Sequence, residues 1–256
     1  MTRFVGLSFA FAVAFAALAP IAQAAEVPAY VAAAVADTAR PKEDTDRDAA
    51  RHPAEIMALT GIKPGDRAVD IGPGKTGYYT RILSRIVGAN GHVFAFNPSW
   101  VDAKFPKAKE GLAALVAEGY ANVEPVVQPM DAIHFDAPLD LVFISQLYHD
   151  QHWQSVTSTI DVAKMNKAIF AALKPGGVYF IIDHTALPGV TTPEQIDKLH
   201  RIDPAVVKAE VLAAGFVLEA ESDILRNPAD PKTALVFDPA IRGHTDQFVF
   251  KFRKPK

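Results

Sequence analysis

The sequence predicts an α/β domain with a mainly parallel sheet and helices on both faces. Strand-like apolar runs alternate with segments of helical period from residue 67 to residue 183, and such alternation is typical of parallel strands joined by crossover helices. The last two strand-like runs have no helix between them, which indicates one antiparallel strand. Half of the 256 residues are apolar, enough to bury the core of one domain, which we expect over residues 47–256.

The first 24 residues have the pattern of an export signal. Arg3 gives a positive start, residues 4–18 are almost wholly apolar, and residues 22–24 offer an A-x-A cleavage site. The apolar stretch is short for a membrane span, so cleavage before Ala25 is favoured over a membrane anchor. We expect a periplasmic or secreted protein that keeps no stable membrane anchor.

Composition narrows the classes of partner. The chain has no cysteine, which excludes disulfides, a lipoprotein anchor and thiolate metal ligands. Its formal net charge is -3, with acidic and basic residues intermixed, so no basic face is expected for nucleic acid or an anionic membrane. A small molecule is the expected partner, and the oligomeric state stays open.

Residues 25–46 are Ala-rich and then charged, which predicts an N-terminal arm or loose helix. Residues 48–59 have helical spacing and end at Gly61. Paired charges over residues 46–55 allow two interpretations: a lid with Arg51 and Glu55 facing a pocket, or a solvated helix face.

The remaining elements follow from apolar period and from turn residues. The expected strands are residues 67–71, 92–96, 123–127, 139–145, 178–183, 216–222 and 246–252. The expected helices are residues 78–87, 107–118, 158–173 and 203–214. A turn at residues 174–177 closes the third of these helices, and residues 224–245 form an insertion in the terminal hairpin.

The segment VDIGPGKTGYYT joins the first strand to a helix. The strand ends in Asp70, and Gly72, Gly74 and Gly77 let the backbone approach a ligand closely at the helix N-terminus. This pattern is typical of a nucleotide-cofactor loop. A phosphate-binding P-loop is excluded, because it would need glycine where Val69 stands.

A dinucleotide loop is a weaker alternative. The three glycines have its spacing, but an acid is expected at the end of the second strand, where Asn97 stands. A nicotinamide-dependent oxidoreductase therefore stays open as a weaker interpretation of the function.

Three features occur together: Asp70 ahead of the glycines, ISQLYHD at the end of the strand at 139–145, and LKPGG before the strand at 178–183. On these residues the chain resembles class I S-adenosylmethionine-dependent methyltransferases. It is similar in particular to a group of bacterial predicted methyltransferases that carry signal peptides. The resemblance covers roughly residues 46–254 and implies a Rossmann-like, seven-stranded sheet and S-adenosylmethionine as cofactor.

The resemblance also implies the cofactor-binding positions, which are Asp70, Gly72, Gly74, Gly77, Asn97, Asp131 and Ser145. Asp70 and the first two glycines would line the methionine part of the cofactor. Asn97 would meet the ribose and Asp131 the adenine amine, while residues 145–150 would face the transferred methyl group.

The chain departs from the family pattern twice. Lys75 and Thr76 make the loop one residue longer than the usual D-x-G-x-G-x-G, and Asn97 replaces an acid. An uncharged amide accepts through one oxygen, so ribose binding is expected to be weaker by about 1 kcal/mol or more. The alternative function is therefore a catalytically inactive, methyltransferase-like module that binds another ligand in the periplasm.

Methyl transfer needs an aligned nucleophile and sometimes a base. Tyr148, His149 and Asp150 follow the strand at 139–145 and are the first catalytic candidates; Asp183 and His184 end the next strand and are the second. Hydrogen bonding within the loops is the structural alternative for both groups.

No metal site is expected. The other histidines considered are His134, His152, His200 and His244. They lack both the i, i+4 helical pairing and the cysteine partners that mark metal ligands in sequence.

Overall fold

The computed structural model describes residues 26–105, 107–153 and 160–256. The expected export signal and the start of the helix predicted from residue 158 lie outside these residues. Among the residues described, no helix has the length and apolar character needed to cross a membrane.

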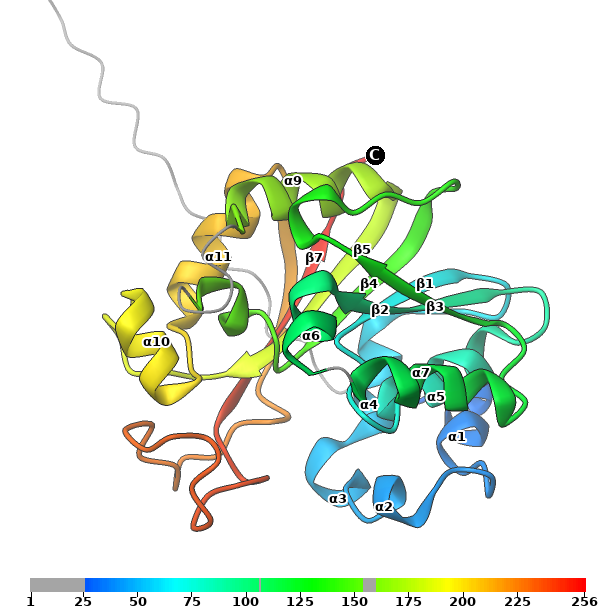
Figure 1. The fold of residues 1–256 in the computed structure, drawn as a ribbon, viewed down its shortest axis with the longest axis horizontal. Helices are drawn as coiled ribbons and strands as arrows, with labels where there is room; N and C mark the ends of the chain where they lie inside the picture. The colour runs from blue at the N-terminus through cyan, green and yellow to red at the C-terminus, as the bar shows by residue number, and fades with distance from the viewer. Residues whose placement is uncertain (1–25, 106, 154–159) are drawn as a thin grey trace, which may run out of the picture.

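A seven-stranded sheet in the order β3-β2-β1-β4-β5-β7-β6 forms the centre of the domain (Figure 1). The strands are β1 (Arg67–Ile71), β2 (His92–Pro98), β3 (Val123–Gln128), β4 (Leu139–Ser145), β5 (Leu173–His184), β6 (Val217–Ser222) and β7 (Gln247–Arg253). The first five strands pair in parallel, and β7 is antiparallel to both of its neighbours. The predicted fold class is therefore confirmed, including the single antiparallel strand.

Helices cover both faces of the sheet (Figure 1). One apolar cluster joins the sheet to α1 (Ala29–Val35), α4 (Pro53–Thr60) and α5 (Tyr78–Val87). The other joins it to α9 (Val162–Ala172), α10 (Pro193–Leu199) and α11 (Pro204–Ala213). The remaining helical segments are α2 (Lys42–Thr45), α3 (Asp48–Arg51), α6 (Ser99–Lys104), α7 (Lys107–Ala117), η1 (Met130–Ala132) and η2 (His149–His152).

Residues 141–144 of the central strand β4, between Asp140 and Ser145, are all apolar, and the packing of the strand shows why. Leu141 and Phe143 belong to the first cluster, whereas Val142 and Ile144 belong to the second. Because successive side chains of a strand point to opposite faces, a strand covered on both faces needs apolar residues throughout.

Two local predictions were wrong. The helix expected over residues 48–59 is divided into α3 and α4, because His52 takes a left-handed conformation (φ 45°) directly before Pro53. The turn expected at residues 174–177 lies inside β5, which already pairs at Leu173 with Leu139. The pairing of β4 with β5 shifts its register between Leu139 and Leu141, and this irregularity accommodates residues 174–177 within the strand.

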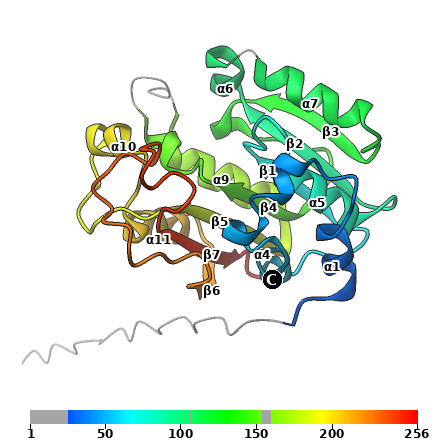
Figure 2. The ribbon, with the colours of Figure 1, turned by 90° about the horizontal axis from the view of Figure 1, so that it is seen from below.

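The insertion at residues 224–245 lies beside α10, as Figures 1 and 2 both show. The backbone N–H of Val236 donates to the carbonyl of Leu199 at 3.3 Å. Arg201 and Asp230, both fully buried side chains, form a two-pronged ion pair at 2.8 and 3.1 Å. These contacts hold the insertion near the carboxyl ends of the parallel strands.

Candidate active site

The loop between β1 and α5 needs glycine for reasons that the structure makes explicit. Gly72 and Gly77 have φ of 71° and 65°, and a Cβ on Gly72 would overlap the side chain of Leu147. Gly77 is the N-cap of α5. Gly74 (φ 71°) differs, because a Cβ there would meet nothing within 4 Å. The loop therefore leaves open space at Gly74, where a ligand can approach the backbone.

Asp70 is the last residue but one of β1, next to this loop. Its carboxylate is buried and accepts a hydrogen bond from the Thr80 hydroxyl at 2.6 Å. Burial raises the pKa of Asp70 to about 6, against the hydrogen bonds from Thr80 and the attraction of Arg51. The acid can thus change its protonation state close to neutral pH.

Two cavities meet at this loop. The first, of about 460 Å³, is named here the loop cavity, and its lining includes Arg51, Asp70, Tyr79, Ser145 and Gln146. The second, of about 650 Å³, is named the adjoining cavity, and its lining includes Asn97, Val101, Phe105 and Ala114. Both are also lined by Gly72, Gly74, Lys75 and Leu147. Their sizes are typical of small-molecule sites.

Asn97 lines the adjoining cavity at the end of β2. Its side chain is almost fully buried, yet its Nδ2 has no hydrogen-bond partner within the part of the chain that the structure describes. A buried donor left unpaired costs roughly 1–3 kcal/mol. A ligand oxygen in this cavity would satisfy the amide, which fits a ribose hydroxyl between the apolar side chains of Val101 and Phe105.

The longer loop is fixed by the N-terminal arm. The Thr76 hydroxyl donates to Asp44 at 2.7 Å and accepts from Arg47 at 3.1 Å. Its carbonyl accepts from Arg81 at 2.8 Å. Thr76 is thereby fixed in the wall of the loop cavity. Lys75 contributes to the walls of both cavities without closing them.

Arg51 closes one side of the loop cavity. Its guanidinium lies over the rings of Tyr78 and Tyr79, 4.8 and 5.7 Å from their centroids, and donates to Gln146 Oε1 at 3.3 Å. The lid interpretation holds for this residue, since Arg51 lines the cavity. Glu55 instead lies 3.9 Å from His52 and, within the described chain, lines neither this cavity nor the adjoining one.

A third cavity, of about 450 Å³, lies beneath the insertion and is named the insertion cavity. It shares Arg47, Arg51 and Gln146 with the loop cavity. Its other lining residues include His184, Phe237, Arg242, His244 and Thr245. Gln146 stands between the two cavities with a positive φ of 59°, a strained conformation of the kind that occurs at functional sites.

The first catalytic candidates lie beyond β4 and do not line these three cavities within the described residues. Tyr148 is buried, and its hydroxyl donates to Glu210 and accepts from Asn166, each at 2.8 Å. His149 bonds through Nδ1 to Asp183 at 2.7 Å. Burial lowers the pKa of His149, but attraction to Asp183 and Asp150 outweighs it and raises the pKa to about 10. The catalytic role of all three residues stays a prediction.

The second catalytic pair divides between two environments. Asp183 is fully buried and bonded to His149, whereas His184 lines the insertion cavity. Burial lowers the pKa of His184 to about 3, so its imidazole is neutral near pH 7. Nδ1 of His184 lies 2.7 Å from the Thr245 hydroxyl.

The structure brings only some of the cofactor residues predicted from the sequence together around the two cavities. Asp70, Gly72, Gly74 and Ser145 share the loop cavity, and Asn97 faces the adjoining one. Asp131 lies half-buried in η1 and, among the residues described, is part of no wall of the three cavities. Gln146 lies within residues 145–150, which the resemblance implied would face the transferred methyl group, although it was not singled out. Arg47 and the insertion residues were missed.

Comparison with known proteins shows the family to which the chain belongs. The model of the protein-L-isoaspartate(D-aspartate) O-methyltransferase (PCMT) family matches residues 17–151, more than half of the chain. The chain belongs to this methyltransferase family. The enzyme class predicted from the sequence is thereby supported, and S-adenosylmethionine is the cofactor that the family assignment supports.

Relatives of this methyltransferase include the ubiquinone/menaquinone biosynthesis C-methyltransferase of Vibrio vulnificus. The two are 31% identical over 195 residues, which cover 75% of this chain and 63% of the relative. The alignment thus spans less than two thirds of that protein's length.

Two solved structures share the fold. A SAM-dependent methyltransferase from Aquifex aeolicus has a TM-score of 0.52 at 18% identity and covers 78% of this chain and 88% of its own. The protein bound by the Haloferax volcanii Trm112 methyltransferase activator has a TM-score of 0.58 at 18% identity and covers 89% and 98%. Both likenesses concern the fold of this methyltransferase.

Proposed function

We propose that this protein transfers the methyl group of S-adenosylmethionine to a small-molecule acceptor. The methionine part of the cofactor lies in the loop cavity against Asp70, and the adenosine lies in the adjoining cavity against Asn97. The observation that carries this proposal is the continuity of the two cavities at Gly72 and Gly74. The unpaired amide of Asn97 supplies a donor for the ribose.

The acceptor lies in the insertion cavity, which borders the loop cavity at Arg51 and Gln146. Reaction requires the acceptor's nucleophile to approach the sulfonium methyl within about 3–3.5 Å, in line with the breaking carbon–sulfur bond. Arg47, Arg51 and Arg242 line this cavity. Guanidinium groups bind carboxylate and phosphate strongly, so the acceptor carries an anionic group.

The proposal includes a location outside the cytoplasm. It also includes membership of the group of bacterial methyltransferases that carry signal peptides. The support for this part of the proposal is the sequence of residues 1–24, with its positive start, apolar stretch and A-x-A site.

Calorimetry with S-adenosylhomocysteine, the product of methyl transfer, tests the cofactor site. We expect saturable binding to the purified protein and at least tenfold weaker binding to Asp70→Ala, which removes a carboxylate from the loop cavity. Absence of heat at millimolar ligand would reject the proposal. Tight binding without transfer of a labelled methyl group to any anionic small molecule would instead favour an inactive binding module.

A further inference from the structure

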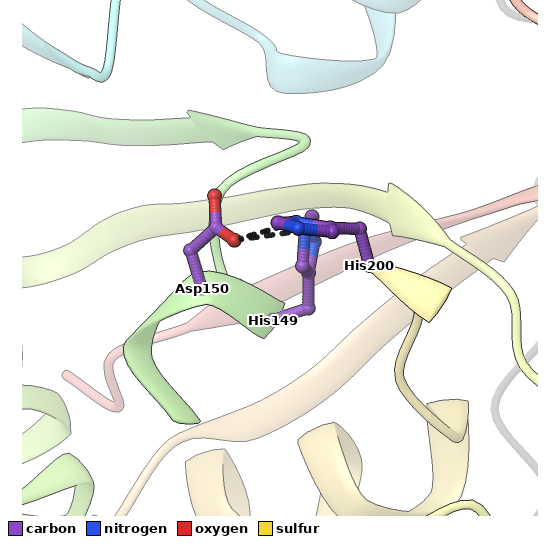
Figure 3. A group of neighbouring side chains, drawn as sticks. All are labelled: His149, Asp150 and His200. Carbon is purple, nitrogen blue, oxygen red and sulfur yellow. Dashed lines mark hydrogen bonds and ion pairs between the residues drawn. The ribbon is translucent and has the colours of Figure 1, made fainter. Parts of the chain in front are cut away.

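Three side chains that line none of the three cavities within the described residues converge beyond the end of β4 (Figure 3). His149 and Asp150 belong to η2, and His200 is the C-cap of α10, 51 residues further along the chain. Nε2 of His149 lies 3.3 Å from Nδ1 of His200 and 3.2 Å from Oδ1 of Asp150. Nδ1 of His200 lies 3.1 Å from the same carboxylate oxygen. The three atoms thus form a nearly regular triangle.

The triangle has the dimensions of one face of a metal coordination sphere. Zinc binds imidazole nitrogen and carboxylate oxygen at about 2.0–2.2 Å. A point about 2.1 Å from all three atoms lies about 1 Å outside their plane and subtends angles of about 100°. These angles fall between the octahedral and tetrahedral values, so a cation fits without separating the side chains.

Asp183 prepares His149 for this role. It accepts hydrogen bonds from the backbone N–H of His149 at 2.8 Å and from Nδ1 of the same residue at 2.7 Å. A metal ion that binds Nε2 displaces the proton that this atom carries in the metal-free imidazolium, while the proton at Nδ1 stays bonded to Asp183. The lone pair then lies on Nε2, the atom that faces Asp150 and His200. Carboxylates commonly orient metal-binding histidines in this way.

His200 is also held in place. Its backbone takes a left-handed conformation, with φ of 50°, which costs energy in a residue other than glycine and persists only where the surroundings impose it. Its ring packs against Trp153 and Phe237 at centroid distances of 5.2 and 5.1 Å. The side chains of Asp150 and His200 are 14% and 15% exposed, so an ion can reach them from solvent.

We propose that His149, Asp150 and His200 bind a divalent transition-metal ion. Two imidazole nitrogens and one carboxylate oxygen favour Zn²⁺, Fe²⁺, Co²⁺ or Ni²⁺ over Mg²⁺ and Ca²⁺, which prefer oxygen ligands throughout. Three protein ligands leave coordination positions for water or for a ligand. The site is separate from the cofactor cavities, and Phe237, which packs on His200, lines the insertion cavity.

Titration with Zn²⁺ alone, followed by calorimetry, tests the proposal on the metal-free full-length protein. We expect one Zn²⁺ per chain and a rise in melting temperature on binding. His200→Asn and Asp150→Asn should each weaken binding at least about tenfold, since each removes one of three ligands. His134→Asn is the matched control, because His134 is 83% exposed and lies 4.0 Å from Asp136; it should bind Zn²⁺ as the unaltered protein does.

Co²⁺ gives a second measurement that needs no variant. Its visible absorption should appear in step with occupancy of one site and should disappear when Zn²⁺ is added. Circular dichroism of the metal-free variants shows whether they fold, and S-adenosylhomocysteine binding reports the cofactor site separately. The proposal is overturned if the unaltered protein shows neither Zn²⁺ heat nor a Co²⁺ spectrum, or if folded His200→Asn and Asp150→Asn bind Zn²⁺ as tightly as the control.

Discussion

The guanidinium of Arg51 donates a hydrogen bond to the side-chain oxygen of Gln146 at 3.3 Å, although 95 residues separate them in the chain. Both residues line the loop cavity and the insertion cavity. The contact joins the N-terminal segment to the first residue after β4. The contact therefore lies between the proposed positions of the cofactor and of the acceptor. There it would help to orient the two ligands toward each other.

Arg51→Ala should weaken S-adenosylhomocysteine binding by about 1.5–3 kcal/mol, roughly 10- to 100-fold, because a charged donor leaves the cavity wall. Isothermal titration calorimetry measures the change. Arg85→Ala is the control, since Arg85 pairs with Asp37 and lines none of the three cavities within the described chain. Equal affinities of the two variants would show that Arg51 does not contact the cofactor.

Asn97→Ala should weaken the same binding by about 1 kcal/mol, roughly fivefold, because the ribose loses a hydrogen-bonding partner. Asn97→Asp should tighten it above pH 7, since a carboxylate accepts from both ribose hydroxyls and carries charge. Fluorescence or calorimetric titration of the three proteins gives the order of affinities. An unchanged affinity in both variants would place the ribose elsewhere.

Cofactor binding should strengthen as pH rises through about 6. Burial raises the pKa of Asp70 to about 6, so its carboxyl is mostly neutral at pH 5 and ionised at pH 7.5. Only the ionised form is a pure acceptor for the cofactor's amine. Calorimetry between pH 5 and 8 should show the midpoint. Thr80→Val removes a hydrogen bond that lowers this pKa, so its midpoint should move to higher pH; an identical profile in Asp70→Asn would assign the titration to another group.

Asp230→Ala should destabilise the protein by about 3–5 kcal/mol, because it leaves the buried Arg201 charge unpaired. Urea unfolding followed by circular dichroism measures this loss. The double variant Arg201→Met, Asp230→Leu should recover much of it, since no buried charge remains. Lys42→Ala, which breaks an exposed pair with Asp46, should change the stability little. A small effect of Asp230→Ala would mean that water reaches the pair.

The exported protein should begin at Ala25. Intact-mass measurement of protein recovered from the periplasm should show loss of residues 1–24, because the A-x-A site ends at Ala24. Ala24→Leu places a large side chain at the cleavage position and should leave the longer form. Recovery of the uncleaved chain from the cytoplasm would reject the proposed location.

Much of the fold could be predicted because local pattern and tertiary burial agree. The bounds of β1, α5 and β4 match the prediction to the residue. Their apolar period is set by the two covered faces of the sheet. The short helix α10 was missed although Thr192 and Gln195 form a capping box before it, a signal that the sequence contains.

The site was less predictable, since its parts come from distant segments. Gly72 and Gly74 follow from the demand for positive φ and open space, so the loop could be found in the sequence. The reach of Arg51 toward Gln146, and the support of Thr76 by Asp44, depend on how the N-terminal arm folds across the loop. The spacing of residues in the sequence does not predict such contacts.

The sequence by itself determined the strands, the crossover helices between the parallel strands and the position of the glycine loop, because these depend on the period of apolar residues and on backbone conformation near each position. Only the tertiary structure decided that Tyr148 bonds Glu210 within the protein, and that His200 comes to rest beside His149 and Asp150. Such contacts are set by the packing of α10 and α11 against the ends of the strands. Packing brings together residues that are dozens of positions apart, and the sequence near each residue does not predict such contacts.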